Sequence, residues 1–207
     1  MSSTETRAAL MAATIRLVGT AGVRAVTARS VASEAGVNQA LVFYHFDGVD
    51  GLLREAFTQA TREMVSQYGA DLEAAESFAD LHAVGIRLAA DTAANGSAAV
   101  LANVIASAQT DPEQARLLSE TLGLWRSAVE HSVRRVLDRY DIDDTVDAKA
   151  LTATLSAAVV GILLMDSIDG APTTDALGSI AWLARLADRL GKVVPATVKR
   201  RMLRQSR

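Results

Sequence analysis

Apolar residues in this chain recur at every third or fourth position, and no segment shows the period-two alternation of a half-buried strand. Glycines, prolines and the Asn95-Gly96 pair interrupt this helical repeat at intervals. Alanine and leucine are abundant between the interruptions, and both residues lose little conformational freedom on entering a helix. The sequence therefore predicts an all-α protein of about nine helices.

The interruptions divide the chain into three short and six longer predicted helices. We expect them at about 7–18, 28–35, 39–45, 47–68 or 50–68, 77–94, 97–109, 112–140, 146–168 and 173–190. Thr6, Thr27 and Asn38 are candidate caps for the first three. Gly69 and the acidic run Asp71–Glu76 are expected to end the fourth.

Composition excludes several classes of protein. The chain has 207 residues, half of them apolar, and no cysteine. Disulfides, thiolate catalysis and cysteine-bound metals are therefore excluded. Ala150–Met165 is uncharged but only 16 residues long, whereas a membrane-spanning helix needs about 20. We expect a buried helix there, no membrane association and, because no secretory signal is visible, a cytoplasmic protein.

Charge is distributed unevenly. The net charge is −3, but Lys192–Arg207 holds six basic residues and no acidic one. The rest of the chain is therefore acidic, with 15 basic and 24 acidic residues. Two interpretations of this basic tail remain open: a contact to nucleic acid or a solvated, frayed terminus.

The most informative segment is Thr27–Phe46, TARSVASEAGVNQALVFYHF. It predicts two short helices joined by a glycine turn after an amphipathic helix, which is the order of a helix-turn-helix. Ala32 is small where the two helices must cross closely. Gly36 stands where the chain must leave the first of them with a positive φ. The small core is expected to contain Val31, Val37 and Val42.

The second short helix carries side chains suited to reading DNA. Asn38 and Gln39 can each form paired hydrogen bonds with adenine, and Tyr44 and His45 reach phosphates well. Arg29, on the first short helix, can pair with guanine or with a phosphate. On pattern alone, helix-end and solvated positions remain alternatives for these polar residues.

These residues resemble the DNA-binding region of the tetracycline-repressor (TetR) family over about residues 6–55. The resemblance rests on spaced positions that agree together. They are Thr6-Arg7, Gly22, Thr27-x-Arg29-x-Val31-Ala32, Ala35-Gly36-Val37, Phe43-Tyr44-His45-Phe46 and Leu52-Leu53. Beyond this region the chain is similar to the family only in the layout of its helices.

The resemblance implies a three-helix DNA-binding head, a ligand pocket in the helices that follow, and a homodimer formed by the last two long helices. It places at the DNA the positions Arg29, Gln39, Ala40, Phe43, Tyr44 and His45. Thr27 falls where the family caps a helix against a phosphate. Pattern alone favours the core for Phe46 and leaves Phe43 open between core and surface. The usual behaviour implied is repression from a palindromic operator, relieved by a small molecule.

One position departs from the family pattern. The family usually has a phosphate-binding lysine at the start of the fourth helix, where this chain has Val49 between Asp47 and Asp50. Residues 1–46 contain four arginines, no lysine and two acids. Fewer phosphate contacts give weaker and less salt-dependent binding, so we expect DNA affinity of modest strength.

Two further expectations concern the rest of the chain. The helices at 146–168 and 173–190 are apolar on several faces, which favours a four-helix interface between two subunits over ordinary monomer core. A pocket for a small hydrophobic effector is expected where larger or polar residues interrupt the alanine- and leucine-rich helices. Its candidates are Met64, Tyr68, Phe78, His82, Asn103, Trp125 and Met165, although packing alone also explains each of them.

These expectations divide the chain into a helix-turn-helix domain (1–50), a ligand-binding and dimerisation domain (51–191) and a basic tail (192–207). We expect no catalytic, metal or cofactor site, because His45, His82 and His131 lack metal-ligand spacing and no nucleotide or nucleophile motif is present. Two competing hypotheses remain: a helical interaction protein that has lost DNA binding and, less favoured, a helical-bundle enzyme.

Overall fold

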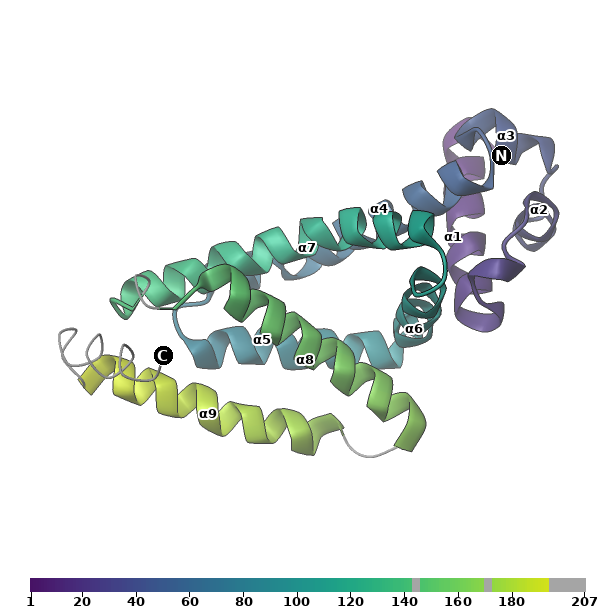
Figure 1. The fold of residues 1–207 in the computed structure, drawn as a ribbon. Helices are drawn as coiled ribbons and strands as arrows, with labels where there is room; N and C mark the ends of the chain where they lie inside the picture. Colours follow the sequence, from purple (N-terminus) through teal and green to yellow (C-terminus); the bar gives the residue numbers. More distant parts are fainter. Residues whose placement is uncertain (143–145, 170–172, 194–207) are drawn as a thin grey trace. The chain divides into compact units, whose positions relative to one another are not determined.

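The computed structural model describes residues 1–142, 146–169 and 173–193. Over these ranges the chain forms nine α-helices and one 3-10 turn, and it has no strand there (Figure 1). The all-α prediction is confirmed. The basic tail lies outside the described residues from position 194 onward.

The helices follow in simple order along the chain. They are α1 (Ser3–Ala21), η1 (Val23–Ala25), α2 (Ala28–Ala35), α3 (Ala40–Phe46), α4 (Val49–Ala74), α5 (Phe78–Ala94), α6 (Ser97–Ala108), α7 (Pro112–Arg139), α8 (Ala148–Asp169) and α9 (Thr173–Val193).

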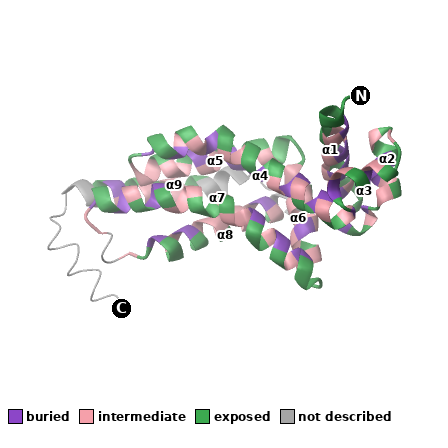
Figure 2. Cartoon of the chain, turned by 90° about the horizontal axis from the view of Figure 1, so that it is seen from above, coloured by how far each residue is buried: buried purple, intermediate pink, exposed green. Residues whose placement is uncertain are grey.

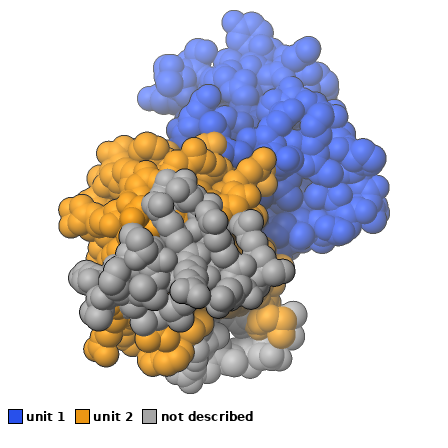
Figure 3. Space-filling model, turned by 60° about the vertical axis from the view of Figure 1, so that its left-hand side comes forward, with its two compact units in different colours: residues 1–64, 92–124 blue, residues 65–91, 125–207 orange. Residues whose placement is uncertain are grey.

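The chain forms two compact units, which Figure 3 colours blue and orange. Unit 1 comprises residues 1–64 and 92–124, and unit 2 comprises residues 65–91 and 125–207. Both α4 and α7 contribute to the two units. This division follows packing, so the functional division at residue 50 stays a prediction.

Unit 1 has a continuous apolar core around α1. Leu10 and Val18 of α1 are fully buried, as are Val31 of α2 and Val42 of α3. The α6 helix packs on the opposite side of α1 and adds Val104 to the same core. Figure 2 shows buried positions along α1 flanked by exposed ones, the pattern expected of an amphipathic helix.

Unit 2 has its own core between α5, α7 and α8. Val133 and Leu137 of α7 are buried against Ala148 of α8. On the α5 side, the ring of Phe78 stacks on Tyr140 with 5.6 Å between ring centroids.

A buried carboxylate on α9 caps the start of α5. Asp188, only 8% exposed, accepts hydrogen bonds from the backbone N–H groups of Phe78 (2.9 Å) and Ala79 (3.0 Å). The hydroxyl of Tyr140 donates a third, at 2.8 Å. Free N–H groups at a helix start attract negative charge, so this contact anchors α9 to α5 and α7.

The start of α1 and the end of α4 differ most from the sequence expectations. The α1 cap is Ser2, whose hydroxyl accepts from Glu5 N at 3.2 Å, whereas Thr6 is buried and donates to Ser2 O at 3.0 Å. The α4 helix runs through Gly69 and ends at Ala74. Tyr68 and Leu72 are both buried, so packing on both sides of Gly69 offsets its weak helix propensity.

The α8 helix is less buried in one chain than the sequence predicts. Ala148–Met165 is long and apolar enough to cross a membrane by length and composition alone, and 17% of this window is buried. Soluble core helices pass the same test, so one such helix is weak evidence for a membrane protein. Half of the residues in this window are half-buried, and twice as many of the others are exposed as are buried.

Candidate nucleic-acid interface

The α2 helix begins with a reciprocal cap, as the sequence predicts for Thr27. The Thr27 hydroxyl accepts from Ser30 N at 3.0 Å, and the Ser30 hydroxyl accepts from Thr27 N at 2.9 Å. Ser30 also donates to Ala25 O at 2.8 Å. These bonds fix the entry of the chain into a helix of only eight residues, which would be marginal alone.

The turn after α2 depends on Gly36. This residue has φ +67° and ψ 34°, the left-handed conformation expected from the sequence. Its N–H donates to α2, and Val37 N donates to Ala32 O at 2.9 Å. Ala32 is 3% exposed, so its small side chain lies inside the packed motif as predicted. Together these contacts end α2 and turn the chain toward α3.

The α3 helix is held by the core beneath it. Val42 is fully buried and Phe46 is 5% exposed, which confirms the core interpretation of Phe46. The sequence predicts Asn38 as the cap of this helix; in the structure the N-cap is Gln39, without a side-chain cap, and Asn38 Oδ1 accepts from Ala40 N at 2.9 Å. The inner face of α3 is therefore fixed at both its start and its end.

The outer face of α3 carries large side chains that nothing in unit 1 covers. Phe43 is 60% exposed and Tyr44 is 80% exposed. The other proposed DNA contacts are also at the surface: Thr27, Arg29, Asn38, Gln39 and Ala40 are exposed, and His45 is half-buried. The eight residues proposed from sequence thus come from α2, α3 and their caps.

An aromatic row runs from this surface into the core. The rings of Tyr44 and His45 meet edge to face with centroids 4.8 Å apart, and His45 is 6.1 Å from Phe46 in a similar geometry. Edge-to-face pairs are favourable contacts beyond simple burial. The row therefore restricts the orientation of the exposed Tyr44 ring.

Arg7 is a positioning residue whose role the sequence pattern does not predict. Its guanidinium donates to His45 O at 2.8 Å, pairs with Glu55 of α4 and lies 4.7 Å over the Phe46 ring. One side chain of α1 therefore ties α3 to α4. No local pattern shows this contact, because Arg7 and His45 are 38 positions apart.

The joint between α3 and α4 explains the departure at Val49. Asp47 (φ 59°) and Gly48 (φ 116°) turn the chain sharply, and Val49 packs partly buried against the unit 1 core. A β-carbon on Gly51 would overlap the carbonyl oxygen of Phe46, so the two helices approach closely there. Val49 acts as core, and it supplies no charge for a phosphate.

Among the arginines of the predicted DNA-binding head, Arg29 is one that can still pair with an anion. Arg16 pairs with Glu34 at 2.8 Å across α1 and α2, and both side chains are largely exposed. Within the described part of the chain, Arg29 forms no ion pair. Its charge is therefore free to meet an anion.

Most of the proposed effector residues lie in unit 2. Tyr68 is buried, donates to Asp91 Oδ2 at 2.5 Å and meets Trp125 edge to face at 6.2 Å. Phe78 instead stacks on Tyr140. Met165 is 54% exposed and His82 is half-buried.

The remaining two candidates belong to the other unit. Met64 and Asn103 lie in unit 1. This effector site stays a prediction. No group of three or more potential metal ligands occurs among the described residues.

Residues 10–56 match the family model for bacterial regulatory proteins of the tetR family. This match covers the helix-turn-helix and the start of α4. No curated protein matches the sequence of the chain.

Solved structures match almost the whole chain. FadR from Bacillus subtilis, in complex with stearoyl-CoA, has a TM-score of 0.74 at 13% identity over 86% of this chain and 96% of its own. FadR from Bacillus halodurans, a fatty acid degradation regulator, has a TM-score of 0.74 at 12% identity, over 86% of this chain and 94% of its own. A TetR transcription regulator from Haloarcula marismortui has a TM-score of 0.67 at 19% identity, over 90% of this chain and 97% of its own. At such identities these likenesses show a shared fold.

Proposed function

We propose that this chain, whose residues 10–56 match the family model for bacterial regulatory proteins of the tetR family, represses transcription from a palindromic operator until a small molecule releases it. DNA-binding regulation of transcription is the function that the domain supports. The observation that carries the proposal is the outer face of α3, where Phe43 and Tyr44 are exposed on a helix whose other side is fixed in a core.

The exposed face has the chemistry of the major groove. A helix fits this groove, and its base edges offer hydrogen-bonding groups and thymine methyls. Ala40 and Phe43 suit a thymine methyl, and Gln39 suits adenine. Asn38 has one donor group left after its oxygen accepts from Ala40 N. We assign these residues to base contacts.

Phosphate contacts are assigned to the edges of the same surface. Arg29 and His45 suit a phosphate oxygen through charge or a ring N–H, and Tyr44 through its hydroxyl. The Thr27 hydroxyl lies at the start of α2, where backbone N–H groups favour an anion. Few such contacts are offered, so the proposed affinity is modest and its salt dependence shallow.

A second copy of the chain is the proposed partner of α8 and α9. Large apolar side chains on these helices are exposed in one chain: Met165 (54%), Trp182 (60%), Leu183 (56%) and Leu186 (37%). An apolar face on two neighbouring helices fits a two-fold four-helix interface. Such a dimer presents two recognition helices to half-sites about 34 Å apart.

Release by an effector requires different affinities of the ligand for two states of the dimer. Unit 2 offers the Tyr68–Trp125 pair as one wall of an effector site. A fold relative is described in complex with stearoyl-CoA, which makes long apolar molecules the first class to screen. We place the protein in the cytoplasm, where its operator would be.

The test is selection of genomic DNA fragments by the purified full chain, followed by sequencing. The proposal expects a palindromic site enriched by the wild type and lost in Arg29→Ala/Tyr44→Ala. Arg16→Ala is the matched control, because Arg16 is an exposed head arginine already paired with Glu34. Absence of enrichment at low salt would overturn the DNA-reading function.

A helical interaction protein is the second candidate. It is favoured by the weakly basic head and by Val49, which packs against the core. In that case the exposed aromatics of α3 would bind a protein. An enzyme is the least supported alternative.

A further inference from the structure

A hollow of about 330 Å³ lies within unit 1, apart from the exposed face of α3. It is formed by η1, the start of α4 and the turn that joins α6 to α7. Its apolar wall consists of Val23, Val26, Val49, Leu53 and Pro112. Its polar residues are Arg24, Asp50, Ser107, Thr110, Asp111 and Gln114. The volume falls at the lower end of the range for small-molecule sites.

Gln114 gives this hollow an unsatisfied polar group. The residue is 7% exposed, and its side-chain oxygen Oε1 is buried without a hydrogen-bond partner. Buried amide oxygens are rarely left unpaired, because an unmade hydrogen bond costs free energy. Gln114 is one of the residues that line the hollow, so the N–H group of a ligand that reaches this oxygen would satisfy it.

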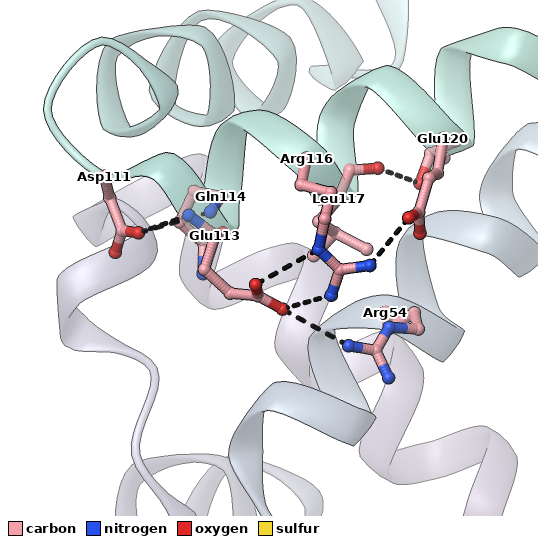
Figure 4. Close-up of polar contacts among 8 residues, drawn as sticks. Arg54, Asp111, Glu113, Gln114, Arg116, Leu117 and Glu120 are labelled. Carbon is pink, nitrogen blue, oxygen red and sulfur yellow. Dashed lines mark hydrogen bonds and ion pairs between the residues drawn. The ribbon is translucent and has the colours of Figure 1, made fainter.

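The charges around the hollow favour a positive ligand. Glu113, at the start of α7, is already engaged by Arg116 at 2.6 Å and by Arg54 of α4 at 3.4 Å (Figure 4). Asp111 caps α7 through one oxygen only, accepting from Glu113 N at 2.9 Å. Asp50 has no ion pair among the described residues. The lining of the hollow therefore holds two carboxylates and one guanidinium, that of Arg24.

We propose that this hollow binds a small amphipathic amine. The ammonium group lies between the carboxylates of Asp50 and Asp111 and donates to Oε1 of Gln114. The alkyl part covers the wall formed by Val23, Val26 and Val49. Each feature of the hollow is then used: the apolar wall, the excess of acceptors and the unpaired amide oxygen.

The position of the hollow links it to α3. Val49 and Asp50 begin α4 only three and four residues after Phe46, the last residue of α3. A ligand held there stabilises one arrangement of the joint between the two helices and so changes the affinity for DNA. This consequence, unlike the binding itself, rests on the proposed regulator function.

The test uses hexylamine as the probe and hexanoate as the control of equal length and opposite charge. Valine methyl NMR signals of the full chain are recorded without DNA. We expect hexylamine to shift the methyls of Val23, Val26 and Val49 with a Kd on the order of 1 mM, given its size. Signals of Val133 and Val136 in unit 2 stay unchanged, and hexanoate causes no comparable shift.

Two variants locate the interaction. Asp50→Asn and Gln114→Leu each weaken hexylamine binding by about tenfold, the loss typical of a hydrogen bond to a charged group. Glu120→Gln is the matched control, because it removes an equal charge from α7 outside the hollow and leaves binding within about twofold. Equal shifts with hexanoate, equal binding by Asp50→Asn, or no shift at about ten times the expected Kd would each overturn the amine site.

The two proposals fail separately. Loss of the methyl shifts refutes the amine site and leaves DNA recognition untouched, because no DNA is present. A chain that shows the shifts but selects no operator retains the amine site and loses the regulator function.

Discussion

Phe43 and Phe46 lie three residues apart on α3, yet one is 60% exposed and the other 5% exposed. Arg7 covers the ring of Phe46 and holds the last turn of α3 through His45 O. The same residue type therefore has two roles on one short helix, and the side of the helix decides between them.

Replacing each of these phenylalanines with alanine should separate the two roles. Phe46→Ala should lower the free energy of unfolding by about 3–5 kcal/mol, because it leaves a cavity in the core. Phe43→Ala should change it by less than about 0.5 kcal/mol but weaken operator binding by about 1–3 kcal/mol. Urea denaturation and DNA titration measure the two effects. Equal loss of stability in both variants would contradict the assignment.

Tyr140 gives the stability of the protein a pH dependence. Burial, together with its hydrogen bond to Asp188, raises the pKa of Tyr140 to about 12 from 10.0. Above pH 10 the unfolded chain loses this proton while the folded chain keeps it, so the free energy of unfolding falls as the pH rises from 10 toward 12. Burial and Asp91 have the same effect on the pKa of Tyr68.

The Tyr140→Phe variant should lose part of this alkaline slope. It should also be about 1 kcal/mol less stable at pH 8, because Asp188 loses one of its three hydrogen bonds. Urea denaturation between pH 8 and 11.5 compares the slopes, with Tyr44→Phe as the control because Tyr44 is 80% exposed. An unchanged slope in Tyr140→Phe would refute the role given to burial.

At the scale of the helix, the effect of a glycine on stability depends on its position, at a helix end or inside a helix. Gly36 ends α2 with φ +67°, whereas Gly69 lies inside α4 with open space beside it. Replacing Gly36 with alanine should destabilise the chain by about 1 kcal/mol, because alanine rarely adopts a left-handed backbone. Gly69→Ala should instead stabilise it by up to about 1 kcal/mol. Thermal unfolding distinguishes the two, and the same sign in both would contradict the backbone argument.

Local chemistry explains which elements could be predicted from sequence. Thr27 and Gly36 act within a few residues of themselves, so the limits of α2 were predictable. The continuation of α4 beyond Gly69 depends on the burial of Leu72, which no local pattern shows. Asp188 caps a helix 110 positions away, and Arg7 holds α3 across 38. Such contacts appear only once the chain is folded.

At the scale of the whole molecule, the proposed dimer explains the exposed apolar faces of α8 and α9. The double variant Trp182→Glu/Leu183→Glu should be monomeric at micromolar concentration, because it places charges in a desolvated interface. Its helix content should be preserved, since both positions are exposed in one chain. Ala83→Glu, an exposed position on α5, is the control. Sedimentation measures the mass, and a double variant that stays dimeric would contradict the interface.

Recognition of DNA by the exposed face of α3 is the central claim, and an affinity comparison tests it most directly. The selected operator and a shuffled sequence are titrated at one salt concentration with the wild type and with Tyr44→Ala, alongside Arg16→Ala. We predict that the wild type and Arg16→Ala prefer the operator by at least about 10³-fold, and that Tyr44→Ala loses most of its operator affinity while its unfolding curve is unchanged. Equal affinity of the wild type for both sequences would contradict the claim.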